Sequence, residues 1–113
     1  MIVNVWIPLS HAVTNPPLAI GVPVNRRDFH IGECQLIYAE RTGVMNLVKD
    51  SSALQWNYVS ALNIDEALIF KTFDSGPDEP SWISTPHSAF WTEIEPNQPL
   101  RQSIELRCAV ELN

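Results

Sequence analysis

The sequence predicts one mainly β domain, built as a sandwich or barrel of short strands. Short runs rich in β-branched and aromatic residues recur along the chain, and nine prolines together with glycine-marked turns separate them. Helix signals are weak by comparison. A length of 113 residues suits a single domain over residues 1–113. Packing about seven or eight such strands requires a sandwich or a barrel.

Seven runs of the sequence are the expected strands. They cover Ile2 to Trp6, Leu18 to Val24, Gln35 to Ala39, Val44 to Lys49, Gln55 to Val59, Ala67 to Phe73 and Ser103 to Leu112. The third and fourth runs flank Thr42-Gly43, a turn signal that predicts a hairpin. The last run alternates most clearly: even-numbered apolar residues from Ile104 onward face one way and odd-numbered residues from Ser103 onward face the other.

The remaining segments predict turns and loops. Asn63-Ile64-Asp65-Glu66 has the spacing of a capping box, which predicts one short helical turn. Asp74 to Pro86 contains a glycine and three prolines and is expected to be a long loop. Glu95 to Pro99 is expected to be irregular.

Composition excludes several classes of function. Seven Lys and Arg against thirteen Asp and Glu give a formal charge of −6, a field that repels nucleic acid. No apolar stretch approaches the roughly 18 residues that cross a bilayer, and the first residues do not form a signal peptide. We therefore expect a cytoplasmic protein with neither nucleic acid nor membrane as a partner. Cys34 and Cys108 are expected to be reduced and buried.

His87 has the most informative surroundings of the three histidines. It lies in Thr85-Pro86-His87-Ser88-Ala89-Phe90-Trp91, directly after the proline-rich loop. A histidine at the mouth of a strand, beside a loop and aromatic residues, is placed for contact with a ligand. A surface or structurally bonded histidine gives the same pattern, so both hypotheses stay open.

The charged residues near the C-terminus form a second candidate. Positions 101, 103, 105 and 107 are predicted to share one strand face, which would place Arg101, Glu105 and Arg107 together. Two guanidinium groups beside a carboxylate can bind an anion, although an exposed charge ladder has the same pattern. Lys71 and Asp74 form an acid–base pair or a surface salt bridge.

Aromatic residues form the third candidate. Trp6, Trp56, Tyr58, Trp82 and Trp91 could line a small-molecule pocket or form the core. Motifs for other chemistries are missing: there is no His-x-Asp or His-x-Glu pair, no His-Glu-x-x-His and no glycine-rich phosphate loop.

Several motifs, in order along nearly the whole chain, resemble the CmcJ/AsaB-like hydroxylase/desaturase family of fungal natural-product tailoring enzymes. They are Asn4-Val5-Trp6-Ile7-Pro8-Leu9, Pro17-Leu18-Ala19, Trp56-Asn57-Tyr58, the run from Asp65 to Ser75, Pro86-His87-Ser88-Ala89-Phe90 and the run from Arg101 to Arg107. Ile7 stands where the family tends to have Arg. The motifs correspond to the C-terminal half of the family.

The resemblance implies a jelly-roll, or double-stranded β-helix, fold like that of iron and 2-oxoglutarate oxygenases. It implies that His87 is the distal iron ligand and that Arg101 or Arg107 holds the co-substrate carboxylate. It also implies that the other two ligands lie in an N-terminal half that this chain lacks, whereas an iron site normally takes two His and one carboxylate.

Two hypotheses therefore remain for function. In the first, the domain works without a metal or other cofactor and performs cyclisation, pericyclic or isomerisation chemistry on a biosynthetic intermediate. In the second, another subunit completes an iron and 2-oxoglutarate site, or the chain is a non-catalytic accessory subunit. In either form the partner would be a second copy of this chain or a longer homologue. The predicted catalytic residues are His87, Arg107 and Lys71, and the predicted substrate-binding residues are Trp6, Trp56, Tyr58, Trp91, Arg101 and Glu105.

Overall fold

The computed structural model describes residues 1–25, 29–76, 84–92 and 98–111. Its strands are β1 (Ile2–Pro8), β2 (Leu18–Pro23), β3 (Ile31–Ile37), β4 (Thr42–Val48), β5 (Leu54–Tyr58), β6 (Leu68–Phe73), β7 (His87–Ala89) and β8 (Ser103–Ala109). One short 3-10 helix, η2 (Ser51–Ala53), precedes β5. The mainly β prediction is confirmed. The described part of the chain holds no helix with the length and apolar character that crossing a membrane requires.

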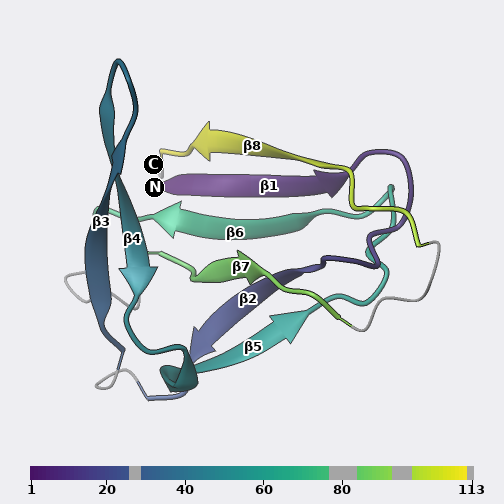
Figure 1. Ribbon diagram of the computed structural model, residues 1–113, viewed down its shortest axis with the longest axis horizontal. Coiled ribbons are helices and arrows are strands. Elements are labelled where there is room, and N and C mark those ends of the chain that lie inside the picture. Colours follow the sequence, from purple (N-terminus) through teal and green to yellow (C-terminus); the bar gives the residue numbers. More distant parts are fainter. Residues whose placement is uncertain (26–28, 77–83, 93–97, 112–113) are drawn as a thin grey trace.

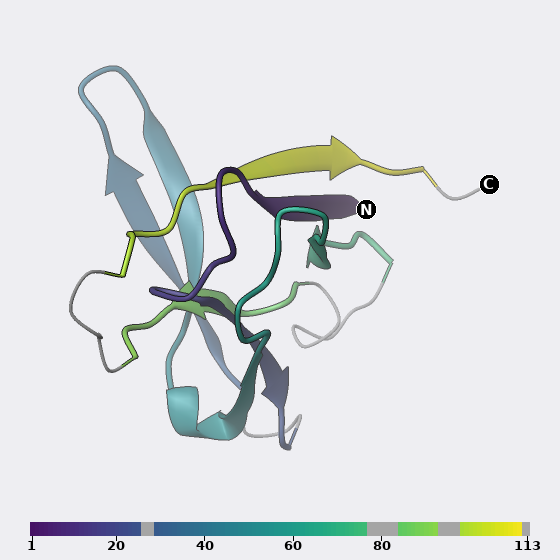
Figure 2. The ribbon, with the colours of Figure 1, turned by 90° about the vertical axis from the view of Figure 1, so that its right-hand side faces the viewer.

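The strands form two antiparallel sheets and a separate hairpin (Figure 1). The β1 sheet has the order β6-β1-β8, and the β2 sheet has the order β5-β2-β7. Strands β3 and β4 pair only with each other, and their hairpin extends beyond the two sheets in both views (Figures 1 and 2). Strands that are distant in sequence, such as β1 and β8, are therefore neighbours in space.

The core lies between the two sheets and takes residues from β1, β2 and β6. Its buried cluster consists of Trp6, Val13, Leu18, Leu62 and Phe70, with Ile20 and Leu68 packed against it. Alternation explains the choice of residues along β1, because Asn4 and Trp6 point inward while Val3 and Val5 point to the other face. The isolated bridge between Val13 and Leu62 ties the loop after β1 to the same core.

Two local predictions have different outcomes. Asn63 begins the expected single turn, because its backbone N–H donates to Glu66 Oε2 over 2.8 Å in the manner of a capping box. The hairpin is confirmed, but its predicted turn is wrong, because Thr42 and Gly43 lie inside β4. The chain instead reverses over residues 38–41, where the N–H of Tyr38 donates to the carbonyl of Arg41 and the guanidinium of Arg41 stacks on the Tyr38 ring.

The two cysteines are free, but neither is buried. Cys34 is half-buried on β3, and Cys108 is exposed on β8. The expectation of buried thiols is wrong for Cys108 because it lies on an edge strand, on the sheet face that points away from the core.

Gly21 occupies a position where a side chain has no room. Its N–H donates to the carbonyl of Pro86 over 2.8 Å, which holds the segment before β7 against β2. A Cβ atom at this position would lie 2.8 Å from Leu54 Cδ1 and 3.2 Å from Pro86 Cβ.

We predict that Gly21→Ala lowers the free energy of unfolding by about 1–3 kcal/mol, the usual effect of overpacking. Chemical denaturation measures it. Gly43→Ala is the matched control, because its nearest contacts at 3.9 Å leave room for a methyl group. Equal stability of the two variants would contradict the close approach at Gly21.

Candidate functional site

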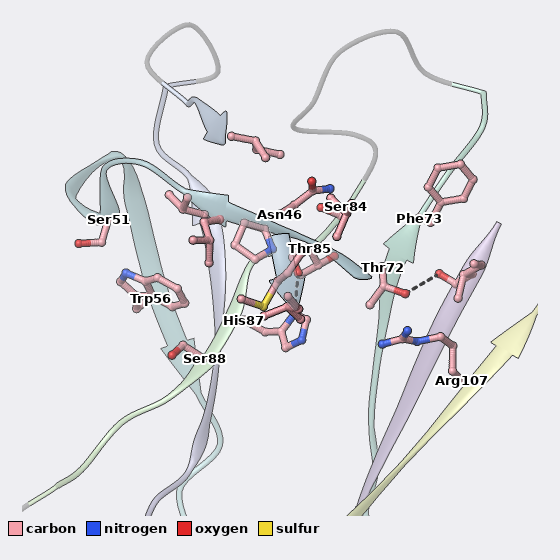
Figure 3. Close-up of a pocket in the computed structure, with 18 residues that line it drawn as sticks. Asn46, Ser51, Trp56, Thr72, Phe73, Ser84, Thr85, His87, Ser88 and Arg107 are labelled. Carbon is pink, nitrogen blue, oxygen red and sulfur yellow. Dashed lines mark hydrogen bonds between the residues drawn. The ribbon is translucent and has the colours of Figure 1, made fainter. Parts of the chain in front are cut away.

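A cavity of about 670 Å³ opens between the two sheets and the β3–β4 hairpin. Apolar side chains from the hairpin and from β5 form much of its wall. The polar residues on its lining include His87 from β7, Thr72 from β6 and Arg107 from β8 (Figure 3). An apolar cavity with a few converging polar groups is the usual form of a small-molecule site.

The ring of His87 is held in a defined orientation. Its Nδ1 atom lies 2.9 Å from the carbonyl oxygen of Thr85, and its ring packs on Phe70 with centroids 4.7 Å apart. Because a carbonyl only accepts hydrogen bonds, Nδ1 carries the proton. In the neutral imidazole, Nε2 then carries the lone pair that can take a proton or bind a ligand.

Arg107 is positioned by a buried amide. Its Nε donates to Asn4 Oδ1 over 3.4 Å, and its Nη2 lies 3.7 Å from Glu105 Oε1. Its guanidinium points from β8 toward the side of the cavity that carries His87 (Figure 3). The sequence therefore correctly placed Glu105 and Arg107 on one strand face, and the structure adds their shared partner.

Asn4 is the residue of this site that the sequence analysis missed. Its side chain is fully buried, donates to Glu105 Oε1 over 2.6 Å and also accepts from Thr72 Oγ1 over 3.2 Å. The signal was available, because Asn4 interrupts the inward face of β1 between Ile2 and Trp6. A polar residue on a buried face requires hydrogen-bonding partners.

Lys71 lies apart from His87 and Arg107. It pairs with Val3 of β1, on the sheet face opposite to Asn4, and it is not part of the cavity lining. Its Nζ donates to Asp74 Oδ2 over 3.0 Å. This bond, together with the Gly76 N–H, holds the pKa of Asp74 below its usual value. The structure thus places Lys71 in a salt bridge rather than beside the cavity.

Arg101 also lies outside the predicted charge ladder, because β8 begins only at Ser103. Its Nη1 donates to the Pro16 carbonyl over 3.1 Å, and its guanidinium lies over the Trp6 ring at 5.5 Å. Trp6 itself is a core residue with 5% of its surface exposed. The placement of Arg101 and Trp6 therefore does not support their predicted role in substrate binding.

The remaining aromatic residues separate into different environments. Trp56 lines the large cavity and also a second, smaller cavity of about 430 Å³. Tyr58 and Phe90 also line the smaller cavity, and their rings meet edge to face with centroids 5.0 Å apart. Trp91 is exposed and lines neither cavity. Trp82 lies outside the described residues.

Over residues 1–25, 29–76, 84–92 and 98–111, no group of three His, Cys, Asp or Glu side chains is placed to hold a metal ion. The described residues therefore do not fit a three-ligand iron site by themselves. His87 is the one histidine among the residues that line the large cavity.

The two antiparallel sheets place the chain in the mainly β, jelly-roll class of folds. The chain belongs to the family described as the oxidoreductase/YMDC permease-like domain, whose model matches residues 1–111. This membership, together with similarity to two fungal proteins, confirms the resemblance to the hydroxylase/desaturase family that the sequence motifs indicated.

Two curated fungal proteins are similar over 96% of this chain. Oxidoreductase R1 from Phoma sp. and hydroxylase/desaturase asaB from Aspergillus flavus are each 34% identical to it. A solved structure of a variant of the iron and alpha-ketoglutarate-dependent endoperoxidase NvfI matches 94% of the chain with a TM-score of 0.72 and 28% identity. The chain spans 39% and 54% of the two relatives and 40% of NvfI, so it covers about half of their length or less.

We predict that Asn4→Ala lowers the free energy of unfolding by about 2–4 kcal/mol, because it leaves Thr72 and Glu105 without a buried partner. Urea denaturation measures the loss. Asn57→Ala is the matched control, since its amide is exposed and bonds only to the nearby Gln55 carbonyl in the described structure. A stability change no larger than that of the control would show that the Asn4 network contributes little.

Proposed function

We propose that the chain acts on a small biosynthetic intermediate of fungal secondary metabolism, in metal-independent cyclisation, pericyclic or isomerisation chemistry. The observation that carries the proposal is that His87 and Arg107, each fixed by a protein partner, line one largely apolar cavity. Similarity to fungal tailoring proteins supports the class of substrate.

The two residues have complementary roles in this proposal. Nε2 of His87 takes a proton from carbon or oxygen of the intermediate and can return it at another position, which is the core of an isomerisation. Arg107 stabilises negative charge that develops on a carbonyl oxygen. Trp56 and the apolar hairpin wall orient the substrate against these two residues.

We predict that the chain accelerates the ring opening of 5-nitrobenzisoxazole, a flat aromatic probe that opens to a coloured phenolate when a base removes its acidic C–H proton. His87→Ala should reduce the rate by about 10²-fold, the usual contribution of a positioned base. Absorbance of the phenolate measures the rate.

His30→Ala is the control, because His30 is exposed and does not line either cavity. Both folds are checked by circular dichroism. If both variants keep the wild-type rate, or lose it equally, His87 is not the base.

A second candidate function follows from the similarity to NvfI, which is an iron and alpha-ketoglutarate-dependent endoperoxidase. This chain covers 40% of that protein, and its described residues do not supply three ligands. We infer that an iron and 2-oxoglutarate site, if the chain takes part in one, uses His87 together with ligands from another polypeptide. A non-catalytic accessory subunit is the remaining form of this candidate.

Iron retention tests the metal-independent proposal against the form of the second candidate in which two copies of this chain share an iron site. Purified chain incubated anaerobically with ferrous iron and then desalted should retain well below one iron per chain if the cavity works without metal, and His87→Ala should leave that value unchanged. Retention of about one iron per chain, lost in His87→Ala, would overturn the metal-independent proposal and support a shared site with the three ligands that iron needs.

A further inference from the structure

Strand β8 is an exposed edge. It ends the order β6-β1-β8, and every residue from Ile104 to Ala109 is exposed, whereas no residue of the central strand β1 is. Its apolar side chains are exposed as well, with 44% of Ile104 and 49% of Leu106 accessible. Figure 1 shows β8 along the border of its sheet.

Edge strands normally carry features that block pairing with another chain: short length, charged side chains (especially Lys and charges that point inward), Pro, a bulge, or a covering loop. At the opposite edge of the sheet, β6 has Lys71, an irregular register with β1, and a bond from the Thr85 N–H to the Lys71 carbonyl. β8 has seven residues, contains neither Lys nor Pro, and pairs with β1 without a register shift. Its two charged residues, Glu105 and Arg107, point to the cavity side and have opposite signs, so they oppose pairing only with a strand that does not match them.

The sequence of β8 is complementary to itself in one antiparallel register. With Leu106 on the two-fold axis, Glu105 of each copy faces Arg107 of the other, on the cavity side of the sheet. On the outer side, Ile104 faces the partner's Cys108 and the two Leu106 side chains meet. Opposite charges and apolar groups at directly opposed positions stabilise antiparallel pairs.

Neighbouring registers lose this match. An axis at Glu105 would place two carboxylates opposite each other, and an axis at Arg107 would do the same with two guanidinium groups. Like charges directly opposite each other destabilise a pair of strands. The charge pattern therefore selects Leu106 as the centre.

We propose that two copies of this chain associate through β8 in the register centred on Leu106, forming one continuous six-stranded sheet. The association is isologous, because the same edge serves both copies. It does not depend on the chemistry in the cavity. A two-fold axis perpendicular to the sheet puts both cavities on the same side of the joined sheet, with Arg107 of one copy beside Glu105 of the other.

The first test measures the mass of the 113-residue chain by sedimentation equilibrium from about 1 µM to about 1 mM, the range in which small interfaces dissociate. The wild type should form dimers. Leu106→Arg should raise the dimer dissociation constant about a hundredfold, because it places like charges on the axis. Ile37→Arg is the matched control, since Ile37 is an exposed apolar residue of the hairpin, with 80% of its surface accessible.

The second test reads the register directly. Glu105→Arg and Arg107→Glu should each prevent dimerisation, because each creates facing like charges. A mixture of the two variants should form a one-to-one heterodimer, because Arg then faces Glu at all four positions. Thermal unfolding of each variant checks that its fold survives the change beside Asn4.

A disulfide trap does not disturb the Asn4 network. Leu106→Cys, in a chain carrying Cys34→Ser and Cys108→Ser, should form a covalent dimer under mild oxidation, since directly opposed residues lie about 5 Å apart. Ile37→Cys in the same background should not. A monomeric wild type, or dimers equally sensitive to Leu106→Arg and Ile37→Arg, would overturn the proposal. So would the failure of both the charge-swapped mixture and the cysteine trap.

Discussion

The fully buried amide of Asn4 connects all three strands of the β1 sheet. It lies on the central strand, donates to Glu105 on β8, and accepts from Thr72 on β6 and from Arg107 on β8. A buried amide left without partners would cost free energy, so the flanking strands must keep the register that supplies them. The same bonds orient Arg107, and the constraint that aligns the sheet therefore also builds the site.

Apolar runs and alternation along the chain predicted seven of the eight strands in the described residues and some of the faces, but missed the three-residue strand β7 and placed β3 a few residues too late. Alternation placed Glu105 and Arg107 together because a strand has a period of two, and a local motif identified His87. Alternation could not place Arg101 or Lys71, because the first residue of β8 and the pairing of Lys71 with Val3 depend on contacts between strands. Contacts between strands are non-local, and the periodicity of the sequence carries no information about them.

Aromatic residues show a second limit of sequence patterns. Trp6 and Trp56 both lie in predicted strands, yet Trp6 lies in the core and Trp56 lines both cavities. The difference comes from the partner each meets: the guanidinium of Arg101 lies over Trp6, whereas Trp56 lies on β5, an edge of the β2 sheet. A tryptophan in a strand is equally suited to either environment until the fold is known.

Both candidate site residues lie on edge strands, His87 on β7 and Arg107 on β8. An edge strand is anchored by hydrogen bonds on one side only, so a partner that pairs with it restricts its motion. Orienting a base and a cation to within tenths of an ångström requires such restriction. In this chain, the network of Asn4 secures Arg107 and the Thr85 carbonyl secures His87 from the inside. Any polypeptide that pairs with β8 would also restrict Arg107 from the outside, so pairing at this edge and the geometry of the candidate site share one strand.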